Sequence, residues 1–388
     1  MNSNEIDLVI CGAGLAGLSL AIRLASIEYA HLKILIIDKS LKDDNDRTWS
    51  FWSKAHDDRF AEIYHKSWPK IAFYSEEVEL ISDCHPYAYH TIKGIDFYRH
   101  CLEIIEAADH ITFMHGEIED LEESSDRVTV RSSSGEIHAH YAYNSIVKKM
   151  PIEDKLFVWQ HFLGWEVEMP EDTFDDEVAT FMDFRIDQAG ETRFVYVLPF
   201  SKKRALIEAT VFSKELWEET SYEALIKAYI SQHFGSTYEV LTKELGKIPM
   251  TTAAFAKASP RIIPIGTNSA TVKPSSGYTF TRIQHEVDRL SEQIKKGVHR
   301  VVTPKSKYIA YDKTLLNVLL TNKETASHVF SLMFKRNNVA ANLKFLDEDT
   351  SLLDEIRIFS TLPFWPFLKA FTVENVLSFA KSKKIRQP

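Results

Sequence analysis

Three glycines near the start of the chain have the spacing of a phosphate-binding turn. Gly12, Gly14 and Gly17 form the pattern G-x-G-x-x-G directly after the apolar run from Ile6 to Cys11, which predicts a buried parallel strand. Gly12 permits a tight turn, Gly14 lets the backbone approach a pyrophosphate, and Gly17 lets the next helix lie close to the strand. The pattern predicts a dinucleotide-binding site, and the alternative is an ordinary glycine-rich turn.

The residues around this turn fit the same chemistry. Leu15 and Ala16 begin the helix, whose N-terminus offers free N–H groups and a positive dipole end to phosphates. A second apolar run ends in Asp38, which Lys39 follows. An acid at the end of this strand accepts hydrogen bonds from a ribose 2′-OH. A strand, a helix and an acid therefore accompany the glycines.

Further along, Arg47 stands beside Trp49, Phe51 and Trp52 in a segment that leaves the nucleotide-binding strands. An arginine at this point is suited to meet a phosphate or the edge of a flavin, while the aromatic rings wall a tunnel. The alternative interpretation is a surface loop that a hydrophobic cluster caps.

Glu208 is an acid within an otherwise apolar run, Ala-Leu-Ile-Glu-Ala-Thr-Val-Phe. Because burial of an unpaired carboxylate is costly, the position indicates either an acid in a dry pocket or a side chain on the solvent-exposed face of a sheet. Asp183 and Arg185, in the run Phe-Met-Asp-Phe-Arg, are either pocket residues or a cross-strand salt pair. Glu244 is a weaker candidate.

The elements that must position these residues are those of an α/β protein with a Rossmann-type sheet. Four β-rich runs between residues 155 and 212 predict an inserted antiparallel sheet with one solvent-exposed face. We expect residues 127–142 to form a hairpin and residues 144–147 to re-enter the first sheet. A late apolar strand ends at Gly266 and Thr267 and leads to a helix over residues 281–298.

The chain of 388 residues is long enough for more than one domain. We predict a dinucleotide-binding domain, a β-rich substrate domain and a helical C-terminal region, which comprise residues 1–67 with 94–150 and 251–300, residues 68–93 with 151–250, and residues 301–388.

Composition excludes several classes of protein. A net charge of -9 argues against nucleic acid as the main partner. The three cysteines have no metal-binding spacing and make no even disulfide set, which fits a reducing compartment. The first strand begins too early for a signal peptide, and no apolar stretch is long enough to span a bilayer. We therefore expect a cytoplasmic protein, soluble or peripheral to a membrane.

Longer motifs extend over nearly the whole chain, and D-R-T-W, M-D-F-R and P-S-x-G-Y-x-F are the most specific of them. They lie at 46–52, 159–165, 182–185, 194–200, 207–210, 246–250, 274–280, 345–347 and 362–363. In their order and distances, these motifs resemble those of the flavin-dependent lycopene cyclases of bacteria and plants.

The resemblance implies an FAD-binding fold of the glutathione-reductase and hydroxylase type. It implies FAD on the glycine turn, NAD(P)H as the donor that keeps the flavin reduced, and Glu208 as the essential acid. It implies a lycopene β-cyclase, in which protonation of a ψ end of lycopene gives a carbocation that closes into a β-ionone ring without net redox change. We expect Asp183 and Arg185 to take part in catalysis with Glu208. The residues expected to bind the cofactor are Gly12, Gly14, Leu15, Ala16, Gly17, Asp38, Lys39, Arg47, Gly266, Thr267 and Gly277.

The chain also departs from the family's pattern. Asn268 and Ser269 stand where relatives often have Gly-Gly, and bulkier residues restrict the approach of the backbone to a flavin. The alternatives to a cyclase are a flavin-dependent reductase or monooxygenase acting on an apolar isoprenoid, and a flavin-binding protein without catalysis.

A lipid-soluble substrate implies contact with a membrane surface. The segment 361–371 carries Phe364, Trp365, Phe367 and Phe371 beside Lys369, a composition that suits the headgroup boundary of a membrane. The alternative is a core helix that closes the substrate tunnel.

Overall fold

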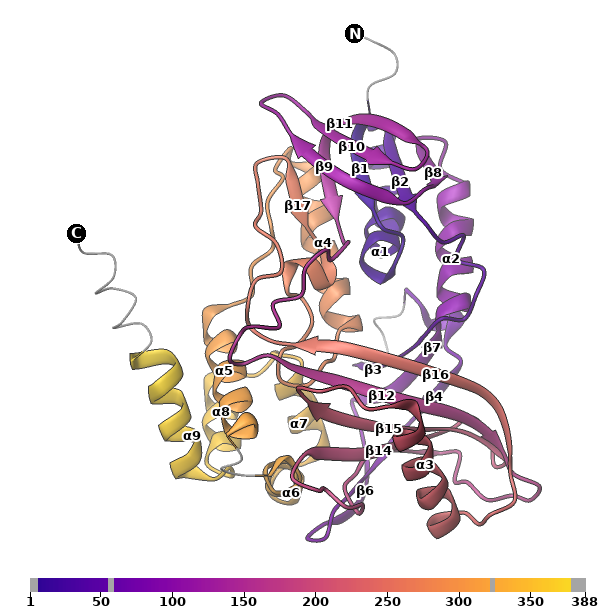
Figure 1. Cartoon of the computed structure of the whole chain (residues 1–388), viewed down its shortest axis with the longest axis vertical. Helices are drawn as coiled ribbons and strands as arrows, with labels where there is room; N and C mark the ends of the chain where they lie inside the picture. Colours follow the sequence, from indigo (N-terminus) through magenta and orange to yellow (C-terminus); the bar gives the residue numbers. More distant parts are fainter. Residues whose placement is uncertain (1–5, 55–58, 322–324, 378–388) are drawn as a thin grey trace.

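The computed structural model of the protein describes residues 6–54, 59–321 and 325–377. Figure 1 shows two sheet-based halves, one above the other, with α4 descending from the upper half toward the junction and the C-terminal helices beside the lower half. The candidate site residues come from both halves, so their arrangement depends on how the halves meet.

The sheet of the upper half is mostly parallel and carries the glycine turn. Its order is β8-β2-β1-β11-β10-β9, and β17 pairs with the end of β11. Strands β8, β2, β1, β11 and β17 run parallel, whereas β9, β10 and β11 form an antiparallel meander. The bounds are β1 (Ile6–Cys11), β2 (Ile34–Asp38), β8 (Ile111–His115), β9 (Ile118–Glu123), β10 (Val128–Ser132), β11 (Gly135–Asn144) and β17 (Ile262–Pro264).

The hairpin of β10 and β11 confirms the prediction for residues 127–142. The chain also re-enters the parallel sheet, but it does so through residues 139–144 of β11, and residues 145–147 lie outside any strand. β11 uses both of its edges: its first half, residues 135–139, pairs with β10, and its second half, residues 139–144, pairs with β1. One strand of ten residues, β11, therefore belongs both to the hairpin and to the parallel part of the sheet.

Both faces of this sheet are covered. One face packs in a hydrophobic cluster with α1 (Leu15–Leu24), α2 (Gly94–Glu106) and α4 (Phe280–Lys295). The meander covers the other face, where Val128 and Val130 pack with Val9 and Cys11. A short 3-10 helix, η1 (Ile27–Tyr29), follows α1.

The sheet of the lower half has the order β16-β12-β15-β14-β13-β5-β6. Its neighbours are antiparallel except β13 and β5, which are parallel. The bounds are β5 (Lys70–Tyr74), β6 (Glu79–Asp83), β12 (Val158–Glu168), β13 (Val178–Asp183), β14 (Thr192–Pro199), β15 (Arg204–Ser213) and β16 (Glu239–Met250).

The expectation of a solvent-exposed face on this sheet is wrong, because both faces are buried. On one face, Tyr222 and Ile226 of α3 (Glu219–His233) pack against Leu163 and Ile207. The opposite face packs against a three-stranded sheet and against C-terminal helices. The small sheet has the order β3-β7-β4, with β3 (Thr48–Lys54), β4 (Lys66–Trp68) and β7 (Tyr87–Lys93), and η2 (Ala61–Ile63) precedes β4.

The C-terminal region is helical in its described part. It comprises α5 (Ser306–Leu320), α6 (Ala326–Arg336), α7 (Val339–Leu346), α8 (Leu352–Phe359), α9 (Phe364–Phe371) and a final π-helical turn, η4 (Thr372–Leu377). Phe330 and Phe334 of α6 and Leu343 of α7 join the core of the lower sheet. The division of the chain into three domains stays a prediction. In the structure, residues 68–93 contribute strands to both the lower sheet and the small sheet.

Candidate active site

The three glycines of the first turn have different surroundings: two leave no room for a side chain, and the third faces open space. Gly12 has a φ of +97°, and a Cβ there would lie 2.3 Å from Ser145 Oγ. A Cβ at Gly17 would lie 1.9 Å from the carbonyl oxygen of Gly12, so α1 sits against the turn. At Gly14 a Cβ would meet no atom within 4 Å. The free space at Gly14, at the N-terminus of α1, is the space that a pyrophosphate needs.

Asp38 holds the turn in place at the end of β2. Its Oδ2 accepts a hydrogen bond of 2.6 Å from the Ala13 N–H, and its Oδ1 accepts one of 2.8 Å from Ser40. Lys42 lies 3.2 Å from Oδ1. Lys39 instead extends toward Glu117 and is exposed. Of the two neighbours, Asp38 contacts the glycine turn and Lys39 does not.

The late turn at Gly266 packs directly on the start of α1. Gly266 has a φ of +63°, and a Cβ there would lie 2.6 Å from the Cβ of Ala16. Glu286 of α4 accepts the Gly266 N–H at 2.8 Å, so the turn is fixed from the other side as well. This contact brings the two strand–turn junctions of the upper sheet together.

Asn268 and Ser269 belong to the 3-10 turn η3 (Gly266–Ser269) and are tied to neighbouring elements. The Asn268 side chain donates to the Asn144 carbonyl oxygen at 3.1 Å, and Ser269 Oγ donates to Glu286 Oε1 at 2.5 Å. Each side chain therefore has a structural partner in the sheet or in α4. Thr267, between them and Gly266, lines a cavity.

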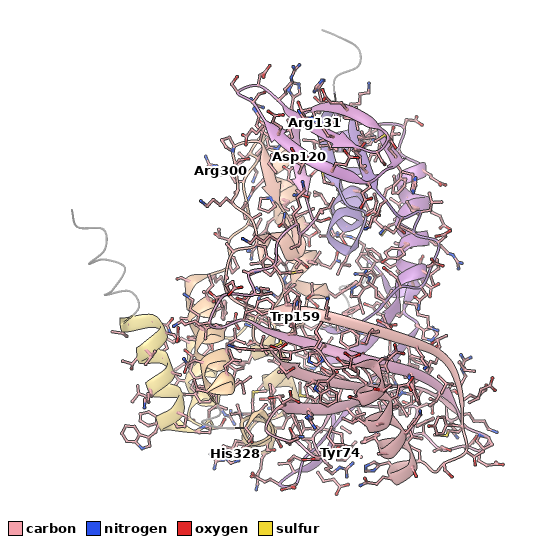
Figure 2. The ribbon with its side chains drawn as sticks, viewed as in Figure 1. Tyr74, Asp120, Arg131, Trp159, Arg300 and His328 are labelled. Atoms are coloured by element: carbon pink, nitrogen blue, oxygen red, sulfur yellow. The ribbon has the colours of Figure 1, made fainter. Side chains whose placement is uncertain are left out.

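This cavity, of about 240 Å³, lies where the two halves meet. Its walls come from β3, β7, the lower sheet, and the turns before α4. In Figure 2, Trp159 marks the level of this junction, and its chain neighbour Gln160 lines the cavity. The cavity thus lies beside the Gly266 turn and receives side chains from the lower sheet.

Glu208 is one of these side chains. It lies on β15 opposite Tyr196 of β14, and both residues line the cavity. Thr210 Oγ1 donates a hydrogen bond of 2.8 Å to Glu208 Oε1. Burial, followed by the nearby charge of Glu244, raises the pKa of Glu208 to about 8, so the carboxyl is protonated near neutral pH. Of the two alternatives that the sequence left open, the structure favours the acid in a pocket.

Aromatic and amide side chains to which the sequence motifs assign no role surround Glu208 in the cavity. The hydroxyls of Tyr196 and Tyr278 lie 3.2 Å apart, and Tyr89 lines the same cavity. The signal in the sequence for these residues is that Gln160, Tyr196 and Tyr278 occur inside the longer motifs, whereas Tyr89 lies outside them. Their grouping around the acid depends on four separate segments of the chain: β7, β12, β14 and the turn before α4.

Two buried polar atoms in this cavity have no hydrogen-bond partner among the described residues, Gln160 Oε1 and Ser276 Oγ. Gly277 stands beside them with a φ of +72°, and a Cβ there would lie 2.1 Å from Gln160 Oε1. Unpaired buried polar atoms of this kind are usually satisfied by a ligand or water. Together with the open space at Gly14, they fit a polar cofactor that extends from the glycine turn to the cavity.

The segment after Arg47 is not a surface loop, because Thr48–Lys54 forms β3. Arg47 lines the cavity, lies 2.7 Å from Asp46, and is about half exposed. The Thr48 N–H donates to Glu244 Oε1 at 2.8 Å, which joins β3 to β16 of the lower sheet. Glu244, the weaker candidate, is therefore close to the site.

The structure places Asp183 and Arg185 away from Glu208. Asp183 pairs with Val195, whereas Glu208 pairs with the next residue of β14, Tyr196, so the two acids point to opposite faces of the sheet. Neither Asp183 nor Arg185 lines the cavity, and the two form an ion pair with each other. Their expected role in catalysis stays a prediction, which this placement does not favour.

The ion pair itself is well defined. Asp183 accepts hydrogen bonds from Arg185 at 2.8 and 3.0 Å and from the Tyr229 hydroxyl at 2.7 Å. Arg185 stacks 3.9 Å over the ring of Tyr74, which Figure 2 shows at the lower edge of the molecule. The salt-pair alternative is thus the one that the geometry supports, within one bulged strand end instead of across strands.

Comparison with known proteins agrees with this architecture. The family model described as "Lycopene cyclase protein" matches residues 7–372. The chain belongs to the lycopene cyclase family. The resemblance inferred from the motifs is confirmed by this match.

A relative in Pantoea ananas, "Lycopene beta-cyclase", is 25% identical over 94% of this chain and 96% of its own. Two solved structures share the fold at 12% identity. A geranylgeranyl bacteriochlorophyll reductase-like protein from Thermoplasma acidophilum has a TM-score of 0.59, with 98% of this chain and 99% of that chain covered. A flavoprotein/dehydrogenase from Cytophaga hutchinsonii has a TM-score of 0.61, with 91% and 99% covered. The predicted flavoprotein fold with an inserted β-sheet is confirmed.

Proposed function

We propose that this member of the lycopene cyclase family is a lycopene β-cyclase that converts ψ ends of lycopene to β-ionone rings, making β-carotene, with reduced FAD and with NAD(P)H as electron donor. The observation that carries the proposal is the carboxyl group of Glu208, whose pKa burial raises to about 8, in an aromatic-walled cavity beside the Gly266 turn.

FAD fits the residues that line its expected path. The N–H groups of Leu15 and Ala16 and the open space at Gly14 would receive the pyrophosphate, and Asp38 would lie beside the adenosine ribose. At the other end, Thr267 and the unpaired Gln160 would meet the flavin ring. Bound in its reduced form, FAD would supply negative charge near a developing cation.

Glu208 performs the proton chemistry in this proposal. Because Oε1 accepts the hydrogen bond from Thr210, Oε2 carries the proton. The proton adds to the terminal double bond of the ψ end and leaves a tertiary carbocation. The neighbouring double bond then forms the ring bond, and a ring proton returns to the Glu208 carboxylate. One proton enters and one leaves, so no electrons are transferred to the product.

The aromatic residues that line the cavity would stabilise the cationic intermediate. The rings of Tyr196 and Tyr278 present π faces that stabilise a cation at close range. The bulk of these rings also excludes water from the carbocation, and water would otherwise trap it as an alcohol.

Co-expression with a lycopene-producing pathway tests the proposal. We expect β-carotene in the pigment extract, and Glu208→Gln should lower its rate of formation about 10²–10⁴-fold while FAD stays bound. Persistent lycopene with the unaltered chain would contradict a cyclase. The mass of the product separates the alternatives, because cyclisation leaves it unchanged, reduction adds two hydrogens and hydroxylation adds an oxygen.

Contact with a membrane surface is the second part of the proposal. Among the described residues, no helix is both long and apolar enough to cross a membrane. On α9, however, Phe364 and Trp365 are 65% and 75% exposed, while Ala370 is buried against the neighbouring helices. The predicted core helix that closes a tunnel does not fit such exposure, whereas a helix lying in the headgroup region does.

The sequence that follows α9 contains several basic residues. Lys381, Lys383, Lys384 and Arg386 follow it in the chain and lie outside the described residues. An amphipathic aromatic helix and a cluster of basic residues together favour anionic lipids. A surface of this kind would place the cavity near the lipid phase that dissolves lycopene.

A further inference from the structure

Glu208, Gly164 and Glu244 form one row across three neighbouring strands of the lower sheet. In the antiparallel ladders, Gly164 of β12 pairs with Glu208 of β15 on one side and with Glu244 of β16 on the other. Side chains in one such row point to the same face of a sheet. The two glutamates therefore face the same space, and the residue between them has no side chain.

The absence of a side chain at Gly164 leaves space that the Glu208 side chain occupies. A Cβ at Gly164 would lie 3.6 Å from Glu208 Cβ and 3.7 Å from Glu208 Cγ, and 3.0 Å from a methyl group of Leu206. These distances are shorter than the usual spacing of paired side chains, about 4.5–5.5 Å. The Glu208 side chain thus lies over Gly164, the residue that separates it from Glu244 in the row.

Glu244 does not line the cavity, which separates its role from that of the acid. Its Oε1 accepts the Thr48 N–H at 2.8 Å, an interaction that favours the ionised form. Burial acts in the opposite direction and, on balance, the pKa of Glu244 is raised, with burial as the largest cause. Among the described residues, the Thr210 hydroxyl is the side-chain donor to Glu208, and burial raises the pKa of Glu208 to about 8.

Other charged groups near Glu208 have partners of their own. Arg47 pairs with Asp46, and Lys247 Nζ lies 5.3 Å from the centre of the Trp159 ring. The remaining titratable groups that face Glu208 are the hydroxyls of Tyr89, Tyr196 and Tyr278, which are neutral near pH 7 because burial raises their pKa values. After burial, the charge of Glu244 is the next cause that raises the pKa of Glu208, and the nearby charge of Arg47 favours the ionised form of Glu244.

We propose that Glu244 is a positioning residue whose negative charge, acting across Gly164, keeps Glu208 in the protonated form that cyclisation requires. The same side chain anchors the cavity wall β3 to β16 through Thr48. The inference rests on the proposed function for its catalytic meaning, but the coupling of the two carboxyls is a property of the folded chain itself.

The isosteric variant Glu244→Gln separates charge from anchoring, because a glutamine Oε1 still accepts the Thr48 N–H. Removal of the charge lowers the pKa of Glu208, so a smaller fraction of the enzyme is protonated at alkaline pH. We expect the loss of cyclisation rate at pH 8 to exceed the loss at pH 6 by about threefold or more. Glu244→Asp, which keeps the charge, should restore most of the alkaline activity.

A matched control comes from the same strand. Glu239 is an exposed acid at the start of β16, and Glu239→Gln removes one charge far from the row. It should leave the pH profile unchanged. An equal loss at both pH values in Glu244→Gln would indicate a structural role alone and would overturn the proposal.

A titration that needs no substrate keeps the test independent of the cyclase assignment. Infrared difference spectra of the FAD-bound protein report the C=O stretch of a protonated carboxyl, and the Glu208→Gln variant assigns the band. In Glu244→Gln the band should disappear at lower pH than in the unaltered protein. An unchanged midpoint would overturn the coupling even in an active cyclase, whereas a shifted midpoint in a protein that leaves lycopene unchanged would support the coupling and contradict only the proposed reaction.

Discussion

The hydroxyl groups of Tyr196 and Tyr278 lie 3.2 Å apart in the cavity that contains Glu208, and they join the lower sheet to the turn before α4. The ring and the hydroxyl of Tyr278 have separable roles. Tyr278→Phe removes a buried hydrogen bond, and we expect it to cost about 1 kcal/mol of unfolding free energy with little change in kcat. Tyr278→Leu removes the π face as well and should lower kcat about tenfold. Similar kcat losses in both variants would contradict stabilisation of the cation by the ring.

Glu208 should also make stability depend on pH. Its pKa is raised by burial from the ordinary 4.5 to about 8 in the folded protein, so its contribution to stability is complete below about pH 4.5 and is lost as the pH rises to about 8. Relative to the unaltered protein, Glu208→Gln should therefore gain unfolding free energy between these pH values. Urea denaturation at pH 5 and pH 8.5 measures the difference, and Glu239→Gln serves as the control. A difference that does not vary with pH would show that Glu208 titrates normally.

Gly14 and Gly17 should fail in different ways when each is changed to alanine. A methyl group at Gly14 meets no protein atom, so Gly14→Ala should fold normally but occupy the space for the pyrophosphate and weaken FAD binding. A methyl group at Gly17 meets the Gly12 carbonyl oxygen at 1.9 Å, so Gly17→Ala should lower the melting temperature of the protein without FAD. Flavin absorbance after purification and thermal unfolding separate the two effects. Full flavin content in a stable Gly14→Ala variant would argue against FAD at this turn.

Asp183 should matter for folding and not for the pH dependence of cyclisation. Asp183→Asn removes the charge that Arg185 and Tyr229 bind, and we expect a loss of about 2 kcal/mol of unfolding free energy. The remaining enzyme should keep its pH profile, because the side chain lies on the face opposite Glu208. Asp172→Asn, at an exposed position without a hydrogen-bonded partner in the described structure, is the control. A shifted pH profile of cyclisation in Asp183→Asn would contradict this prediction and indicate that Asp183 takes part in the reaction.

The exposed face of α9 should govern binding to lipid. The double variant Phe364→Ser and Trp365→Ser should reduce sedimentation with vesicles that contain an anionic lipid, while activity on detergent-solubilised lycopene remains. Ile27→Ser is a matched control, because Ile27 is 87% exposed but lies in the upper half of the molecule. Equal sedimentation of the double variant and the control would rule out α9 as the contact surface.

Local patterns determined a large part of this protein. The glycine turn, the strands on both sides of α1 and the hairpin of β10 and β11 each depend on residues that are close in the chain, and spacing and side-chain size predict them. A run of apolar residues around Glu208 likewise marked an unusual acid. The sequence motifs were sufficient to place the chain in its family.

Tertiary structure decided which face each acid occupies. Along a strand, successive side chains alternate, so the choice between Glu208 and Asp183 as the acid in the cavity depends on a register with Tyr196 or Val195 that no local pattern specifies. The contact of Gly266 with Ala16 in the upper half and the row through Gly164 in the lower sheet each join segments that are distant in the chain. Sequence determined that an acid and a cofactor turn are present, and packing determined that they share a cavity.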